Sequence, residues 1–94
     1  MSNPYLEALQ ESEKVLAAKE DFQFQLKEYN RKLGAYESDI KDYKLSGKAS
    51  AAGYEDLERR RAELIEEKEL LQETQAEINR MIDRYQEMRA SVEK

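Results

Sequence analysis

Carboxylates are the most numerous side chains in this sequence that could take part in chemistry. The 94 residues include 21 Asp and Glu but no His, Cys or Trp. General-base catalysis at neutral pH most often uses His, and nucleophiles are usually activated by His, Lys or a thiolate partner. The carboxylates of Glu7, Glu11 and the run at 66–69 are expected on solvated helix faces, and a di-iron bundle would also need a Glu-x-x-His pattern. We therefore expect no enzyme activity, no cofactor and no metal site.

The basic run Arg59–Arg61 is the other cluster that could do chemistry, as a contact to phosphate. Its neighbours Glu55, Asp56 and Glu63 each lie four residues from one of these arginines, a spacing that forms ion pairs on one helix face. The whole chain carries 16 basic and 21 acidic residues, for a net charge of −5. Nucleic acids and anionic membranes attract clustered cations, so we expect neither as a partner.

An apolar residue recurs every seven positions in both halves of the chain, which is typical of a helix that lays a narrow seam along another helix. In the first half this column is Phe22, Tyr29, Tyr36 and Tyr43, and in the second half it is Leu57, Leu64, Leu71, Ile78, Tyr85 and Val92. Between the two columns lies a stretch of small residues at 46–53. Gly and Ser in such a stretch indicate a connector.

The pattern predicts a single all-α hairpin over residues 1–94, an antiparallel two-helix coiled coil. The first helix is expected at about 4–45, capped by Asn3 and ended by Gly47. The connector is expected at about 46–53 and the second helix at about 54–93, with Ser50 or Gly53 as its cap. The alanines of the connector leave this second boundary open towards an earlier start.

Folding the chain at the connector suggests a register in which Tyr43 meets Leu57 and Tyr36 meets Leu64. A slip of one heptad stays open, because any two seven-residue columns can be paired in this way. Between these Tyr–Leu layers, Leu26, Leu33 and Ile40 of the first helix would face a second column of the other helix. That column begins with the polar residues Arg61 and Lys68. These long side chains can lay their methylene stems on the seam and place their cations beside Tyr36 and Tyr43.

Near the two termini the apolar stripe becomes wider than a two-helix seam can bury. An exposed apolar patch of this kind marks a contact surface. We therefore expect a protein partner there, either a second copy that completes a homodimeric four-helix bundle or another helical protein. The residues expected to bind this partner are Tyr5, Leu6, Leu9, Leu16, Met81, Ile82, Tyr85 and Met88.

The length and hairpin plan resemble the small secreted helical-hairpin proteins of the WXG100 class. Their Trp-x-Gly turn is missing, since the connector has Gly47 and Gly53 but no Trp. Their C-terminal Tyr-x-x-x-Asp/Glu signal is missing too, because Arg89 follows Tyr85 at the fourth position. The resemblance implies a small exported protein. Secretion-system chaperones and stalk subunits, and prefoldin-like holders, are similar in the same architectural sense.

The function expected from these patterns is that of a non-catalytic interaction module, such as an adaptor, a chaperone-like holder or an assembly subunit. The alternative is an exported WXG100-like protein or a secretion-system subunit. No apolar run approaches the roughly 20 residues that span a bilayer, and Met-Ser-Asn-Pro lacks the layout of a signal peptide. We therefore expect a cytoplasmic protein, and export without a cleaved signal stays open.

Overall fold

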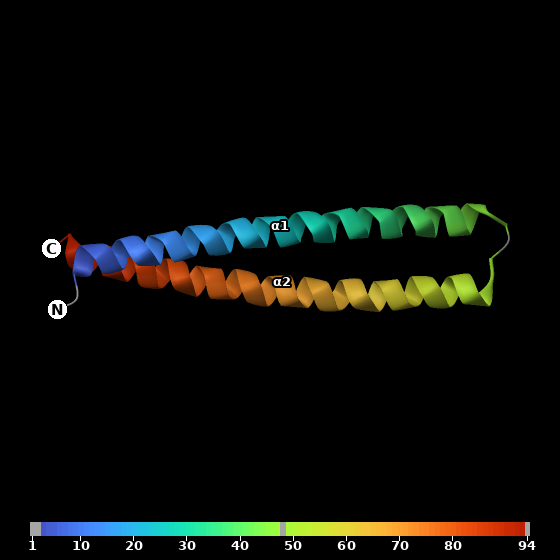
Figure 1. Cartoon of the computed structure of the whole chain (residues 1–94). Coiled ribbons are helices and arrows are strands. Elements are labelled where there is room, and N and C mark those ends of the chain that lie inside the picture. The colour runs from blue at the N-terminus through green and yellow to red at the C-terminus, as the bar shows by residue number, and fades with distance from the viewer. Residues whose placement is uncertain (1–2, 48, 94) are drawn as a thin grey trace. The chain divides into compact units, whose positions relative to one another are not determined.

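Two long helices make up nearly all of the chain (Figure 1). The computed structural model describes residues 3–47 and 49–93. Helix α1 spans Pro4–Leu45 and helix α2 spans Ala51–Val92, and no strand occurs within these described ranges. The predicted fold class, an all-α antiparallel helical hairpin, is confirmed; pairing of two such hairpins into a bundle stays a prediction.

The ends of α1 follow the capping signals in the sequence. Asn3 caps the helix, because its Oδ1 accepts hydrogen bonds from the backbone N–H groups of Tyr5 at 3.0 Å and Leu6 at 3.3 Å. These are two of the N–H groups that a helix start leaves unpaired. At the other end Gly47 has a φ of 66°, a left-handed conformation that Gly adopts cheaply and that stops a helix.

Helix α2 begins at Ala51, three residues before the start expected at 54. Ser50 is the cap, since its Oγ accepts a hydrogen bond from the N–H of Gly53 at 3.1 Å. The Tyr43 hydroxyl donates to the Ser50 carbonyl oxygen at 2.9 Å and so ties α1 to this turn. A Cβ at Gly53 would lie 3.0 Å from the Tyr43 ring, so the close ring explains the glycine.

The chain divides into two compact units, each built from one segment of each helix. The terminal unit contains, among described residues, 3–24 of α1 and 72–93 of α2, and the connector unit contains 25–47 and 49–71. In each unit the two helical segments run in opposite directions (Figure 1). Each unit is described by itself below.

The predicted apolar columns line the helix–helix contact in each unit. Val15 and Ile78 are buried in the terminal unit, and Leu64 and Leu71 in the connector unit. Ile78 is the most enclosed of them, with 3% of its surface exposed. The remaining members of the two columns are half-buried, and the tyrosines among them keep a route for their hydroxyls to solvent.

Two columns of α2 flank the buried aliphatic column. In the predicted one Ile82 is half-buried, whereas Arg61, Lys68, Gln75 and Arg89 are exposed; Arg61 and Lys68 nevertheless line a hollow with Leu33 and Tyr36, as their long stems allow. The column that lies one residue earlier was not predicted, and its members Arg60, Glu67, Thr74, Met81 and Met88 are half-buried. A straight helix of 3.6 residues per turn can present either neighbour of a column to its partner.

Two cross-helix ion pairs involve half-buried positions of α2 in the connector unit. Asp39 lies 2.7 Å from Arg60, and Lys32 lies 3.4 Å from Glu67. Asp39 and Arg60 fall between the predicted layers at Tyr36 and Tyr43, so this unit has the predicted register rather than one slipped by a heptad. The cation over the Tyr36 ring is accordingly Arg60, at 5.7 Å from the ring centre, and not Arg61 or Lys68.

Candidate functional site

Each arginine of the basic run lies beside an acidic side chain. Arg59 donates a hydrogen bond to Asp56, and Arg60 lies between Asp39 and Asp56, the latter at 4.0 Å. Arg61 lies 3.8 Å from Glu58. Exposed pairs of this kind contribute about 0 to 1 kcal/mol each, so their main effect is to neutralise the run.

The carboxylates of the described ranges, 3–47 and 49–93, do not gather into a ligand set. No group of three or more acidic side chains there could hold a metal ion. Within the same ranges, neither helix has a stretch that is long and apolar enough to cross a membrane. What the two helices do present is exposed apolar surface, and four of the eight residues predicted to bind a partner, all on α1, belong to it.

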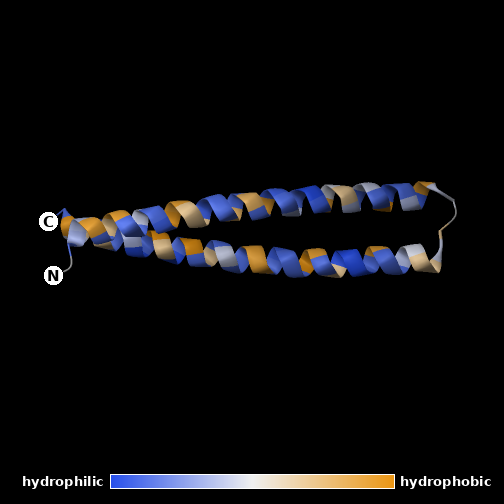
Figure 2. Cartoon of the chain, viewed as in Figure 1, coloured by the Kyte–Doolittle hydropathy of each residue, from blue (hydrophilic) through white to orange (hydrophobic). Residues whose placement is uncertain are grey.

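The α1 segment of the terminal unit carries this surface. Tyr5 is 64% exposed, Leu9 63% and Leu16 59%, and Leu6 is exposed as well. Figure 2 shows hydrophobic residues on both helices where the chain ends lie. Tyr5 and Leu9 are four residues apart and Leu9 and Leu16 are seven apart, so these three share one face of α1.

One side of the terminal unit combines this stripe with residues from α2. A hollow of about 280 Å³ lies there between the two helices. Its lining residues are Tyr5, Ala8, Leu9, Tyr85, Arg89, Val92 and Glu93. Two further residues lie on the same surface as this hollow. Leu16 is seven residues after Leu9 and shares its side of α1, and Ile82 is seven residues before Arg89 and shares its side of α2. We call Tyr5, Leu9, Leu16, Ile82 and Tyr85 the apolar face.

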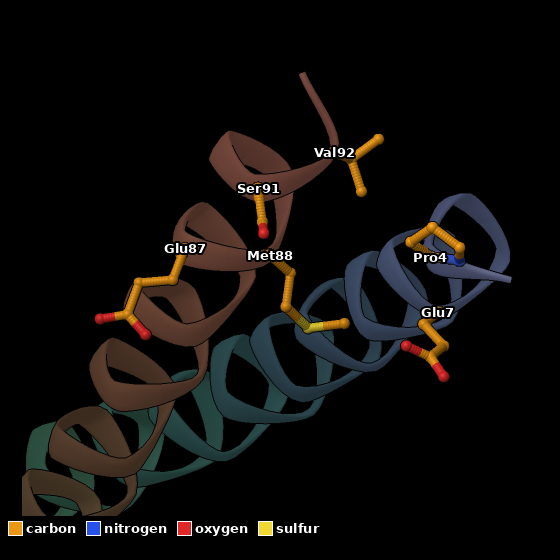
Figure 3. A pocket seen from close by; sticks show the side chains of 6 residues that line it. All are labelled: Pro4, Glu7, Glu87, Met88, Ser91 and Val92. Atoms are coloured by element: carbon orange, nitrogen blue, oxygen red, sulfur yellow. The ribbon is translucent and has the colours of Figure 1, made fainter. Parts of the chain in front are cut away.

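The predicted methionines lie on the opposite side of the seam. Met88 lines a second hollow, together with Pro4, Glu7, Glu87, Ser91 and Val92. Figure 3 shows the Met88 side chain reaching across towards α1, while the carboxylate of Glu87 points away from it. Met81, seven residues earlier, belongs to the same side of α2. The structure therefore separates Met81 and Met88 from the apolar face.

Leu6 belongs to neither hollow. It is one residue, or about 100° of helix rotation, from Tyr5, and it is exposed. Of the eight residues predicted to bind a partner, five thus form the apolar face, two lie across the seam and one lies on the outer side of α1.

Glu11 is a buried residue that the sequence analysis placed on a solvated face, and that expectation was wrong. It is 8% exposed, and its carboxylate lies 4.0 Å from both Lys14 and Arg84. The spacing could have revealed it, since Glu11 follows Ala8 by three residues and precedes Val15 by four. Glu11 was missed because Leu9 and Leu16, which lie on a different face of the helix from Glu11, form the more obvious apolar pattern.

Two opposite charges lie at the rim of the hollow on the apolar face. Arg89 donates a hydrogen bond to Glu93 at 2.9 Å, and this bond, with the Glu93 charge, raises the pKa of Arg89 above its ordinary value. Like any arginine, Arg89 is a permanent cation, and Glu93 is its carboxylate neighbour. The hollow offers an apolar floor with one positive and one negative group at its edge.

No family model, curated protein or solved structure matches this chain. The resemblance to WXG100-class proteins accordingly rests on the helical hairpin alone. A likeness of fold does not carry a function with it.

Proposed function

We propose that this protein is a non-catalytic protein–protein interaction module, an adaptor or assembly subunit that docks a helical protein surface on its apolar face. The observation that carries this proposal is the shared exposure of Tyr5, Leu9 and Leu16, each more than half exposed and all on one face of α1. Beside them lies a hollow with an apolar floor. Concave apolar surface with a few polar groups at its edge is typical of binding sites.

The total surface of the chain supports the same proposal. Its accessible surface is 7649 Å², whereas a globular monomer of 11.1 kDa exposes about 5,700 Å². The excess is roughly 2,000 Å², comparable with the area that a specific protein–protein interface buries in total. A protein partner would remove part of this excess from water.

The charged residues support a non-catalytic role. The arginines of the basic run contact acidic side chains. We attribute to these pairs a contribution to the charge balance and solubility of the hairpin rather than to a reaction. A cytoplasmic location is part of this proposal, and recovery of the chain from culture medium after export would contradict it.

The direct test is affinity capture from a lysate of cells that express the chain natively, with Leu9→Glu/Leu16→Glu as the disabled variant. The matched control is Phe24→Glu, because Phe24 is 68% exposed but lies outside the apolar face. A protein retained by the wild type and by the control, but lost with the double variant, supports the proposal; the chain's own second copy counts as such a protein. Equal retention by all three baits contradicts it.

A further inference from the structure

The exposed residues along one face of α1 are spaced so that the same face of a second copy can pack against them. The stripe along this face runs Tyr5, Leu9, Ser12, Leu16, Lys19, with steps of four and three residues. Two such stripes in antiparallel orientation, centred at Ser12, bring Leu9 of each copy to Leu16 of the other. The same pairing brings Tyr5 to Lys19, where a cation can lie over an aromatic ring. The small Ser12 allows the two helices to approach at the centre.

From this self-complementarity we infer that a second copy of this chain occupies the apolar face, with α1 antiparallel to α1 about a twofold axis near Ser12. The inference rests on the proposed function and adds the identity of the partner. In a twofold contact each residue pair occurs twice. Leu16 of one copy therefore enters the hollow beside Tyr5 and Leu9 of the other, and the reverse contact forms as well.

One charge at the hollow matches a charge beside Leu16. Glu93 lies at the edge of the hollow, and Lys19 follows Leu16 by about one turn of α1. In the antiparallel pairing Lys19 lies level with Tyr5 of the other copy, which lines the same hollow as Glu93, so these two opposite charges come near one another. Opposite charges at a rim favour one partner and one orientation over others, and this chain supplies both.

The limited burial within one copy gives such pairing a driving force. Within the described ranges no side chain is buried beyond 98%, and the buried apolar residues of the terminal unit are Val15 and Ile78. Chains of this size are marginally stable without further burial. A standard interface buries about 1,600 Å² in total, which two copies with roughly 2,000 Å² of excess surface each can supply.

The pairing also places Glu13 of the two copies on the same side of the axis, because each Glu13 is next to the central Ser12. Like charges at such positions oppose association. Glu13→Gln should therefore raise the association constant about twofold, as measured by sedimentation equilibrium at low salt. An unchanged or lower constant contradicts the antiparallel contact, and loss of folding cannot mimic a tighter dimer.

Cysteine cross-linking tests the geometry directly, since the chain has no native Cys. Leu9→Cys and Leu16→Cys chains carrying different tags are mixed and oxidised. The expected product is a mixed disulfide, formed at least tenfold faster than the disulfide between two Leu16→Cys chains. Two Leu16 positions would lie about seven residues, or about 10 Å, apart along the paired helices, beyond the reach of a disulfide.

Leu16→Cys mixed with Phe24→Cys is the control for random collision, because both side chains are well exposed. If the Leu9–Leu16 disulfide forms no faster than this control, a second copy does not occupy the face. That result leaves the proposed function to the capture experiment, in which a different protein can still depend on Leu9 and Leu16. If the three baits in the capture experiment also retain the same proteins equally, both proposals are overturned.

Discussion

Asp39 of α1 and Arg60 of α2 form a hydrogen-bonded ion pair at 2.7 Å, between two layers of apolar residues. Arg60 also lies 5.7 Å from the centre of the Tyr36 ring. One side chain thus joins a carboxylate and an aromatic ring of the opposite helix. This contact fixes which residues of α1 and α2 face one another in the connector unit.

Charge reversal at this pair should destabilise the hairpin, and the double reversal should restore part of the loss. Asp39→Arg or Arg60→Asp alone is expected to lower the free energy of unfolding by up to about 1 kcal/mol, since the pair is partly exposed. Urea unfolding followed by circular dichroism measures each value at one protein concentration. Additive losses in the Asp39→Arg/Arg60→Asp protein would contradict a direct interaction.

Ile78→Ala should be among the most destabilising apolar truncations in the chain. Ile78 is 3% exposed, whereas Ile65 is 49% exposed, so Ile65→Ala is a matched control with the same change of side chain. Burial predicts a loss of about 2 to 4 kcal/mol for Ile78→Ala and under about 1 kcal/mol for Ile65→Ala. Comparable losses in the same urea measurement would show that the seam does not pass through Ile78.

Tyr43→Phe tests the bond between the last turns of α1 and the start of α2. The substitution removes the hydroxyl that donates to the Ser50 carbonyl oxygen and keeps the ring beside Gly53. A loss of about 0.5 to 1 kcal/mol is expected. Tyr54→Phe serves as the control at an exposed tyrosine. Faster amide hydrogen exchange near Ser50 in Tyr43→Phe alone would locate the effect, and equal behaviour of the two variants would refute it.

Glu11→Leu should stabilise the terminal unit. Glu11 is buried, but its two cationic neighbours are both at 4.0 Å, which is long for an ion pair. Replacing a buried charge by an apolar side chain of similar size is often neutral or stabilising. We expect the midpoint of thermal unfolding to rise, while Glu73→Leu on an exposed position leaves it nearly unchanged. A clear fall in Glu11→Leu would mean that Arg84 depends on this carboxylate.

The heptad columns were sufficient to predict the two helices and their antiparallel arrangement. Both the seven-residue spacing and the small connector residues can be recognised within a short stretch of sequence. Gly47 and Asn3 were recognisable as caps for the same reason. The side of each helix was harder to predict. Whether Arg60 or Arg61 joins the seam depends on a partner across the seam, Asp39, which no local pattern in α2 reveals.

The residues predicted to bind a partner show a similar division. The shared face of Tyr5, Leu9 and Leu16 was predictable from sequence because apolar residues at helical spacing stand out among charges. Met88 was grouped with them, although the seam passes between them, because apolar character alone does not tell which side of a helix a residue occupies. Glu11 was missed because a carboxylate in a charged helix resembles its exposed neighbours.

Sedimentation equilibrium of the intact chain at micromolar concentration tests the central claim most directly, namely that the apolar face binds a second copy. We expect a mass of about 22 kDa, twice the 11.1 kDa of one chain. Leu16→Glu should return the protein to the monomer mass, and Phe24→Glu should not. A fully helical wild-type protein that sediments as a monomer, or a dimer that Leu16→Glu leaves intact, would contradict it.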